Sequence, residues 1–318
     1  MFTKSIFAGL ILSLGSLSFS SAAIADEYPT KPITVIVPSK AGGSTDRTAR
    51  MITEIAKMQN DGYEFVIKDI PGSGGQKGFE AINRAKPDGY TIGLVFTPQL
   101  VAHIVSKRAK YNLDSFHVVG NVAQDPAIVV VPKDSDIKNM ADLAKKAKAN
   151  PLTVAVNGIG SDDFLAAKAF EAKAGVSFNL LPTKGSTEQK AGILGGHVDA
   201  AFMNLSQMIA QHKAGDAHII AVLSEERNKN LPDIATSKEQ GYEVYMTATR
   251  GVVAPAKVDA KILAKLDEIL AKVVASDEFK AKAKKGSIYL LPKNGADYAA
   301  YLKGLQADTQ AVYDKAPW

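Results

Sequence analysis

The fold is decided by the stretch Ile33-Thr34-Val35-Ile36-Val37-Pro38-Ser39-Lys40-Ala41-Gly42-Gly43-Ser44-Thr45-Asp46. Four of its first five residues are apolar and β-branched, which predicts a buried strand that ends at Pro38. The glycine pair allows a tight turn, and Ser44 or Thr45 is expected to cap a helix that runs to about Met58.

A strand, a glycine turn and a helix start together predict a site for an anion. The N–H groups in the first turn of a helix have no partner within the helix, and the helix dipole favours negative charge there. Asp46 is expected to be an acid of this first turn rather than a ligand contact, because a carboxylate would repel a bound anion.

The same device recurs along the chain. Each further unit places a glycine-, serine- or threonine-bearing loop after a predicted strand, and these strands lie at 65–67, 90–96, 152–156, 178–181 and 200–204. Strands alternating with helices at this spacing predict right-handed crossovers and parallel pairing, with ligands at the carboxyl ends of the strands. After the strand at 152–156, Ser161 is expected to cap a helix, with Asp162 and Asp163 as acids that suit the helix dipole.

Two such series predict two lobes. A strand at 127–131 and a long mixed stretch at 244–254 are expected to carry the chain between them. We therefore expect residues 26–124 and 251–318 to form lobe one and residues 125–250 to form lobe two. Lobes joined by two crossings close on a ligand by hinge motion.

Residues 1–25 have the pattern of a secretory signal peptide. Lys4 supplies a positive charge, residues 6–17 are a short apolar run, and Ala23-Ile24-Ala25 is a typical cleavage site, so cleavage is expected after Ala25. A membrane anchor is the weaker alternative, because a spanning helix needs about 20 apolar residues. An exported chain of this kind is expected in the periplasm.

The composition narrows the classes of function. The 318 residues are 46% hydrophobic and include no cysteine, which excludes disulfides, thiolate metal sites and a cysteine nucleophile. The net charge of +5 falls to +4 without Lys4, and the Lys and Glu residues are interspersed, which favours a solvated surface over nucleic-acid binding.

Several motifs occur in an order that spans nearly the whole chain after the signal peptide. They are Pro38-x-x-x-Gly42-Gly43-x-x-Asp46-x-x-Ala49-Arg50, Pro71-Gly72-Ser73-Gly74-Gly75, Pro87-Asp88-Gly89-Tyr90-Thr91, Gly158-x-Gly160-Ser161, Pro182-x-Lys184-Gly185, Gly195-Gly196-x-x-Asp199 and Gly251-x-x-Ala254-Pro255. This ordered set resembles the Bug-type periplasmic receptors of tripartite tricarboxylate transporters.

The resemblance implies a type II-like, two-lobed periplasmic binding fold, in which each lobe is a mixed α/β sheet flanked by helices and the ligand lies between the lobes. It implies a monomer that captures a small organic carboxylate and delivers it to a membrane permease, without catalytic residues, cofactor or metal. The expected ligand contacts are Ser39, Lys40, Ala41, Gly42, Gly43, Ser73, Gly74, Gly75, Thr97, Gly160, Ser161, Thr183, Lys184, Gly185, Asn204 and Arg250.

The chain departs from the family at three of these positions. Ser39, Thr183 and Arg250 stand where the family often has an aromatic residue, and Lys40 follows the first of them. A guanidinium can bind a carboxylate through two hydrogen bonds, whereas an ammonium acts as a point charge. We therefore expect a di- or tricarboxylate, with a citrate-like acid favoured.

Other interpretations stay open at this point. The ligand can instead be an amino acid or an aromatic carboxylate, and the output can be a signal to a membrane kinase. An enzyme is the remote alternative, because Lys77 stands where a dinucleotide fingerprint needs its third glycine, and no G-x-S-x-G or Walker motif occurs.

Overall fold

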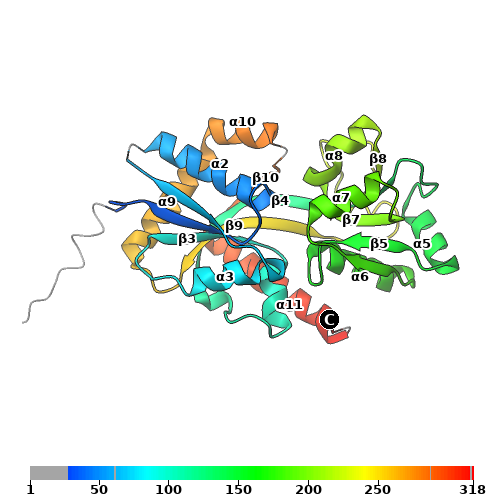
Figure 1. The fold of residues 1–318 in the computed structure, drawn as a ribbon, viewed down its shortest axis with the longest axis horizontal. Coiled ribbons are helices and arrows are strands. Elements are labelled where there is room, and N and C mark those ends of the chain that lie inside the picture. The colour runs from blue at the N-terminus through cyan, green and yellow to red at the C-terminus, as the bar shows by residue number, and fades with distance from the viewer. Residues whose placement is uncertain (1–27, 61, 287, 316) are drawn as a thin grey trace, which may run out of the picture.

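The structure is a computed structural model that describes residues 28–60, 62–286, 288–315 and 317–318 (Figure 1). The predicted signal peptide and its cleavage point therefore lie outside the described residues. Among the helices that the structure describes, none is long and apolar enough to cross a membrane.

Strands and helices alternate along most of the chain. The strands are β1 (Ile33–Val37), β2 (Phe65–Asp69), β3 (Thr91–Phe96), β4 (Phe116–Pro132), β5 (Thr153–Val156), β6 (Asn179–Pro182), β7 (Ala200–Asn204), β8 (Ala217–Val222), β9 (Thr247–Pro255) and β10 (Leu290–Asn294). The helices are α2 (Ser44–Gln59), α3 (Gln76–Asn83), α4 (Gln99–Val105), α5 (Met140–Ala149), α6 (Asp162–Ala174), α7 (Ser186–Leu194), α8 (Leu205–Ala214), α9 (Ala260–Ala275), α10 (Asp277–Lys285) and α11 (Gly295–Lys315), with short 3₁₀ turns η1 (Ser73–Gly75) and η2 (Leu113–Ser115).

The strands form one mixed sheet in the order β2-β1-β3-β9-β4-β7-β5-β6, with β8 and β10 also paired to β4. The β1–β2, β1–β3, β5–β6 and β5–β7 pairs are parallel, as predicted, whereas β4 and β9 run antiparallel to their neighbours. The predicted α/β class with a mixed sheet flanked by helices is confirmed.

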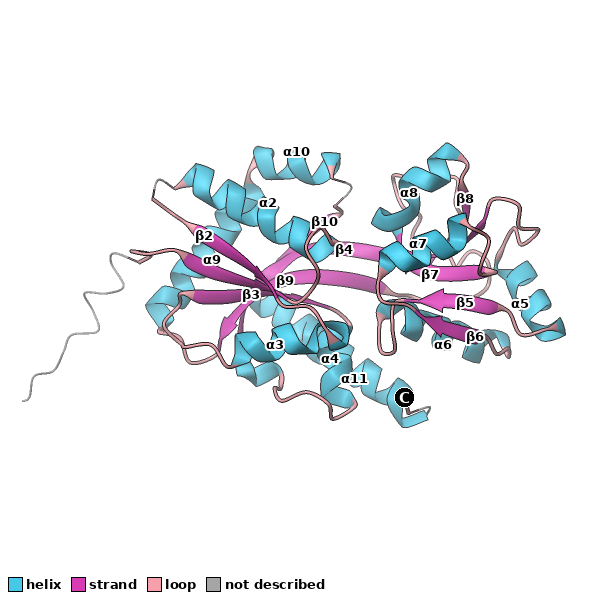
Figure 2. Cartoon of the chain, in the orientation of Figure 1, coloured by secondary structure: helices cyan, strands magenta, loops and turns pink. Residues whose placement is uncertain are grey.

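Strands β4 and β9 run through both halves of the molecule (Figures 1 and 2). We call the half around β1, β2 and β3 lobe one, and the half around β5, β6 and β7 lobe two. The two strands pair with each other from Phe116–Pro255 to Pro126–Thr247, and β4 then continues into lobe two to pair with β7 and β8. The sequence predicted only residues 127–131 of this long strand.

Each lobe has a helical layer on both faces of its sheet (Figure 2). Residues of α2, α9 and α10 pack on one face of lobe one, and residues of α3, α4 and α11 pack on the other. In lobe two, α5 and α6 cover one face and α7 and α8 the other. Alternate residues of β4 enter the two cores, Val129 one and Val130 the other, because successive side chains of a strand point to opposite faces.

The C-terminal residues reach across to lobe two. Val312 and Trp318 pack against the core that α5 and α6 cover, and the rings of Trp318 and Phe164 lie 5.7 Å apart. These contacts connect the lobes in addition to β4 and β9. The expected lobe boundaries at residues 124–125 and 250–251 stay a prediction.

The chain is tightly packed around Gly251, where β9 crosses between the lobes. A Cβ at Gly251 would lie 2.2 Å from Cε1 of Tyr298 and 2.8 Å from the carbonyl oxygen of Gly120. We expect Gly251→Ala to lower the free energy of unfolding in urea by about 1–3 kcal/mol, because overpacking forces side chains off their rotamers.

The matched control is Gly304→Ala in α11, where an added Cβ meets no atom within 4 Å. Alanine there is expected to raise stability by about 0.5–1 kcal/mol, because it restricts the unfolded chain and favours helix. Equal effects of the two substitutions would contradict this packing account.

Candidate functional site

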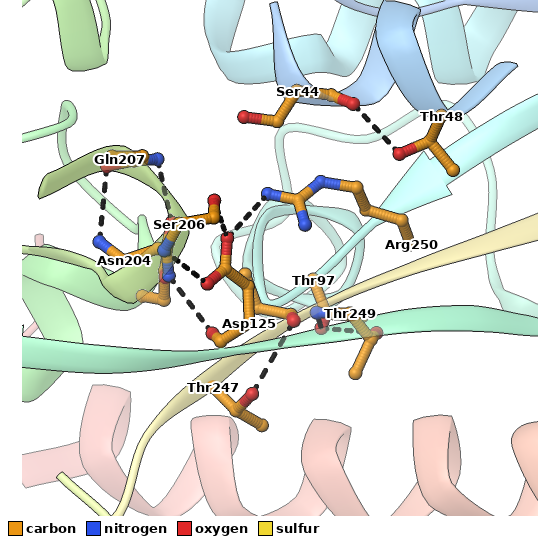
Figure 3. Close-up of polar contacts among 12 residues, drawn as sticks. Ser44, Thr48, Thr97, Asp125, Asn204, Ser206, Gln207, Thr247, Thr249 and Arg250 are labelled. Carbon is orange, nitrogen blue, oxygen red and sulfur yellow. Dashed lines mark hydrogen bonds and ion pairs between the residues drawn. The ribbon is translucent and has the colours of Figure 1, made fainter. Parts of the chain in front are cut away.

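An ion pair lies on the two strands that join the lobes. Asp125 of β4 is 1% exposed on its side chain, and Nη2 of Arg250 on β9 donates to its Oδ2 at 3.4 Å (Figure 3). Its Oδ1 accepts from the backbone N–H of Ser206 at 3.0 Å, and the Ser206 hydroxyl donates to Oδ2. The carboxylate is therefore compensated by a guanidinium and by the start of α8.

The guanidinium of Arg250 has more hydrogen-bond donors than this one bond uses. Arg250 is 6% exposed, and among the described residues only Asp125 accepts a hydrogen bond from its side chain. A guanidinium has five N–H donors in a planar fork that matches a carboxylate. The donors that Asp125 does not use are therefore suited to a second carboxylate.

The predicted loop after β1 uses its own glycine donors. The Gly42 N–H donates to Oδ2 of Asp46 at 2.7 Å, and the Gly43 N–H donates to the Lys40 carbonyl at 3.2 Å. Asp46 is a buried acid of the first helical turn and pairs with Arg50, as expected of a structural role. Gly42 and Gly43 were predicted to contact the ligand. In the structure, both of their N–H groups already have an acceptor within the loop.

The cap of α2 also differs from the prediction. Neither Ser44 nor Thr45 caps the helix, because the N-cap is Gly43, which has no side chain to bond. The backbone N–H groups of Ser44 and Thr45 thus lie in the first turn without an intrahelical acceptor. Ser44 lies in the same region as Arg250 (Figure 3), because β1 pairs with β3 and Phe96 of β3 is opposite Arg250.

The other predicted contacts of this loop differ in exposure. Lys40, Ala41 and Gly42 are exposed, whereas Ser39 is half-buried. The Ser39 hydroxyl oxygen is buried and has no hydrogen-bond partner among the described residues. It is an available donor beside the start of α2.

Thr97 lies in a buried chain of hydroxyl groups. Its Oγ1 is 2.7 Å from Oγ1 of Thr249, and that atom is 2.8 Å from the hydroxyl oxygen of Tyr298. The Thr249 N–H also donates to Thr97 at 3.1 Å. This network fixes the end of β3 against β9 and α11, next to Arg250 in sequence.

The loop after β2 has an unusual backbone. Gly72, Ser73, Gly74 and Gly75 all have positive φ, and a Cβ at Gly75 would lie 2.6 Å from the Phe96 ring. Ser73 and Gly74 are exposed, and the Gly74 carbonyl is 3.1 Å from Nε2 of the buried His103. The structure therefore gives Gly75 a packing role, whereas Ser73 and Gly74 stay accessible.

Two predicted contacts of lobe two lie at the start of α6. Ser161 is buried and caps this helix as predicted, accepting from the Phe164 N–H at 3.1 Å and donating to the Gly158 carbonyl at 2.8 Å. Gly160 is buried where the lobes meet, since a Cβ there would lie 3.3 Å from Cβ of Ala102 and 3.4 Å from Nε1 of Trp318.

The remaining predicted ligand contacts of lobe two form hydrogen bonds within the protein. The Thr183 hydroxyl is within 3.2 Å of the carbonyls of Val156 and Gly185, and the Lys184 N–H donates to Glu188 at 2.7 Å. Asn204 begins α8 with a capping box and donates to Asp162 at 2.6 Å. The Lys184 side chain is exposed, so its ammonium stays accessible.

Two adjacent carboxyl groups are buried beside this cluster. Asp162 and Asp163 are 2% and 1% exposed, and Asp163 accepts from Gln189 at 2.9 Å while its other oxygen has no partner among the described residues. Burial raises the pKa of Asp162 to about 6. Burial and the neighbouring Asp162 charge raise the pKa of Asp163 well above its usual value.

Sequence reasoning missed Asp125 and assigned Asp162 and Asp163 only to the helix dipole. Asp125 has no motif around it, and its importance comes from Ser206, which is 81 residues away. The two acids after Ser161 accept hydrogen bonds from Asn204 and Gln189, which are 42 and 26 residues away in the sequence. An adjacent acid pair after a cap is a sequence signal, but its burial is not.

A cavity of about 980 Å³ lies elsewhere, on lobe one between β4, α9 and α11. Its lining includes Phe116, His117, Leu270 and Ala299, and none of the predicted site residues. In the part of the chain that the structure describes, no group of three histidine or carboxylate side chains is arranged to hold a metal ion.

The fold is that of a solute-binding protein. The chain is 28% identical to BugD, described as a periplasmic binding protein, with a TM-score of 0.80 that covers 91% of this chain and 98% of BugD. It is 26% identical to R. palustris Rpa4515, solved with adipate, with a TM-score of 0.83 over 91% and 98% of the two chains.

Sequence comparison gives the family. Residues 48–315 match the family described as TctC, the tripartite tricarboxylate transporter family receptor. The UPF0065 protein in the gbd 5' region of Cupriavidus necator is 28% identical over 310 residues, which cover 97% of this chain and 94% of that relative. The chain belongs to the tripartite tricarboxylate transporter receptor family, and the predicted resemblance is confirmed.

The buried acid pair predicts a pH dependence of stability. Because the pKa of Asp163 is raised in the folded state, that state binds more protons than the unfolded chain above the unfolded pKa, and stability falls as pH rises through this interval. Asn mimics the protonated acid. We expect the unfolding free energy of Asp163→Asn, relative to wild type, to increase between about pH 4 and about pH 7 in urea titrations.

Asp136→Asn is the control, because the pKa of Asp136 is shifted in the opposite direction to that of Asp163. Asp136 is exposed, and its pKa is lowered chiefly by the hydrogen bond from Lys146. Its contribution is present above the unfolded pKa and is lost as pH falls, so the variant gains no stability with rising pH. A flat pH profile for the Asp163→Asn difference would contradict the account of the buried pair.

Proposed function

We propose that this chain captures a small di- or tricarboxylate between its lobes in the periplasm and delivers it to the membrane permease of a tripartite transporter. The observation that carries the proposal is Arg250, a buried guanidinium that makes one hydrogen bond of 3.4 Å among the described residues. A guanidinium has five N–H donors, so those that Asp125 does not use can bind a ligand carboxylate through two parallel hydrogen bonds.

The surrounding groups favour a carboxylate in this position. The first turn of α2 offers the N–H groups of Ser44 and Thr45, and the buried Ser39 hydroxyl adds an unpaired donor. These neutral donors and the guanidinium together suit an ion of concentrated negative charge. We propose that one ligand carboxylate lies between Arg250 and the start of α2.

The class of ligand is supported by two further points. The aromatic residues expected in the family at positions 39, 183 and 250 are replaced by Ser, Thr and Arg, which reduces stacking surface and adds charge. The similar receptor Rpa4515 was solved with adipate, a linear dicarboxylate. Delivery to a permease rests on the family, whose description is a transporter receptor.

Calorimetric titration tests the proposal. The panel holds adipate, malate, citrate, glutamate and benzoate, each titrated into the purified chain from Asp26 onward. We expect di- or tricarboxylates to bind and benzoate not to bind. Binding of benzoate without binding of adipate, malate or citrate would contradict the proposed ligand class.

Arg250→Gln is expected to weaken binding of the best acid by about 10- to 100-fold, because hydrogen bonds to charged groups contribute roughly 1.5–3 kcal/mol. Arg84→Gln is the control, since Arg84 is exposed on lobe one and pairs with Glu80. Thermal melts without ligand establish that each variant is folded. Unchanged affinity in a folded Arg250→Gln protein would exclude Arg250 from the ligand site.

A further inference from the structure

Three acids and one cation are buried together where β4 and β9 pass between the lobes. Among the described residues Arg250 is the only buried lysine or arginine, and Nη2 of its guanidinium donates to Asp125 at 3.4 Å. Nδ2 of Asn204 donates both to the Asp125 carbonyl at 3.3 Å and to Oδ2 of Asp162 at 2.6 Å. Asp163 follows in α6 and is 1% exposed. Asn204, Asp125 and Arg250 lie together in Figure 3, so the acid pair is linked by hydrogen bonds to the residue that holds the guanidinium.

The charges of this cluster do not balance if every acid is ionised. One guanidinium would then face three carboxylates, and a buried charge without a partner of opposite sign is costly. The donors to the acid pair are neutral, namely the amides of Asn204 and Gln189 and the backbone N–H of Asn157. A proton on the pair therefore reduces the excess negative charge, which the neutral donors leave in place.

The contacts of Asp163 fit a protonated acid. Its Oδ2 accepts from the Asn157 N–H at 3.1 Å and from Gln189 at 2.9 Å, whereas its Oδ1 has no partner among the described residues. The side-chain oxygen of Gln189 is buried and likewise has no partner there. Buried acceptors without a donor are unfavourable, and a protonated carboxyl carries an O–H donor. The hydrogen bonds thus favour a shared proton independently of the charge balance.

The groups around the pair come from several elements. Asp125 of β4 already has the Arg250 guanidinium and the Ser206 N–H as donors. On α11, the pKa of Tyr301 is raised by burial and, to a lesser extent, by the charge of Asp162, so this phenol stays neutral near pH 7. The amides that α7 and α8 contribute do not titrate. A negative charge added at Arg250 is therefore answered most readily by a proton on the acid pair.

Burial raises the pKa of Asp162 to about 6, and the charge of Arg250 is among the influences that hold it down. A ligand carboxylate on the guanidinium adds a negative charge and offsets this influence, which favours the protonated pair further. We propose that capture of a carboxylate at Arg250 takes up a proton into the Asp162–Asp163 pair. This inference rests on the proposed function, because Arg250 holds the ligand in both. Since binding takes up a proton, affinity falls as pH rises.

Calorimetry measures the affinity and the proton uptake together. Adipate, malate, citrate and glutamate are each titrated into the purified chain at about pH 6, 7 and 8, and at about pH 7 in two buffers of different ionisation enthalpy. The affinity of the acid that binds best is expected to fall by about tenfold between pH 6 and pH 8, because one pKa unit corresponds to a tenfold change. The two buffers are expected to show net proton uptake. Binding without proton uptake would overturn the inference and leave the proposed function intact.

The double variant Asp162→Asn/Asp163→Asn locates the proton. It keeps the histidines and the titration of the ligand itself, but its amides do not titrate, so its affinity is expected to change by less than about twofold over the same pH range. Asp136→Asn removes an exposed acid and is expected to keep the pH dependence of wild type.

Thermal melts without ligand establish that the variants are folded, and the buffer comparison on wild type needs no variant. Full pH dependence in a folded double variant would assign the proton to another group and overturn the inference. If wild type binds no acid of the panel at any of these pH values, the proposed function fails and this inference fails with it.

Discussion

A carboxylate with a side chain only 1% exposed must be compensated, and Asp125 obtains its compensation from Arg250 and from the start of α8. These three groups belong to β4, β9 and lobe two, so the ion pair fixes the place where the strands pass between the lobes. Removing one partner of a buried pair costs about 3–5 kcal/mol, because the other charge is left alone. We propose that the same interaction orients the rest of the guanidinium toward a ligand between the lobes.

Internal carboxylates occupy several of the donor sites that the loops create. Asp46 takes the Gly42 N–H, Glu188 takes the Lys184 N–H, and Asp125 takes the Ser206 N–H. Each rigidifies a loop at a helix start and reduces the number of backbone donors left for a ligand. We therefore propose that an anion is recognised less by glycine N–H groups than by the start of α2 and by Arg250, whose guanidinium has donors that Asp125 does not use among the described residues.

The sequence predicted the repeated strand, turn and helix units well, because periodic burial and glycine turns are local signals. It placed β1 and α2 nearly to the residue and identified Ser161 as the cap of α6. It missed most of β4, together with β10 and α10, since their positions depend on pairing with distant strands and helices. Local patterns carry no information on such pairing.

The candidate site was predictable only in part, for the same reason. The loops after β1 and β2 were recognised, but which of their backbone groups are free was not, because Asp46 accepts from the Gly42 N–H and His103 contacts the Gly74 carbonyl oxygen. Arg250 was singled out as a cation in place of an aromatic residue. Its buried partner Asp125, 125 residues earlier, has no signature in the sequence.

The most direct test of the account is a crystal structure of the protein grown with adipate. The account predicts one carboxylate within about 3 Å of the Arg250 guanidinium and of the first-turn N–H groups of α2. Asp125 should remain bonded to Ser206 in that complex. Adipate bound away from Arg250, for instance in the cavity between α9 and α11, would contradict the central role given to this guanidinium.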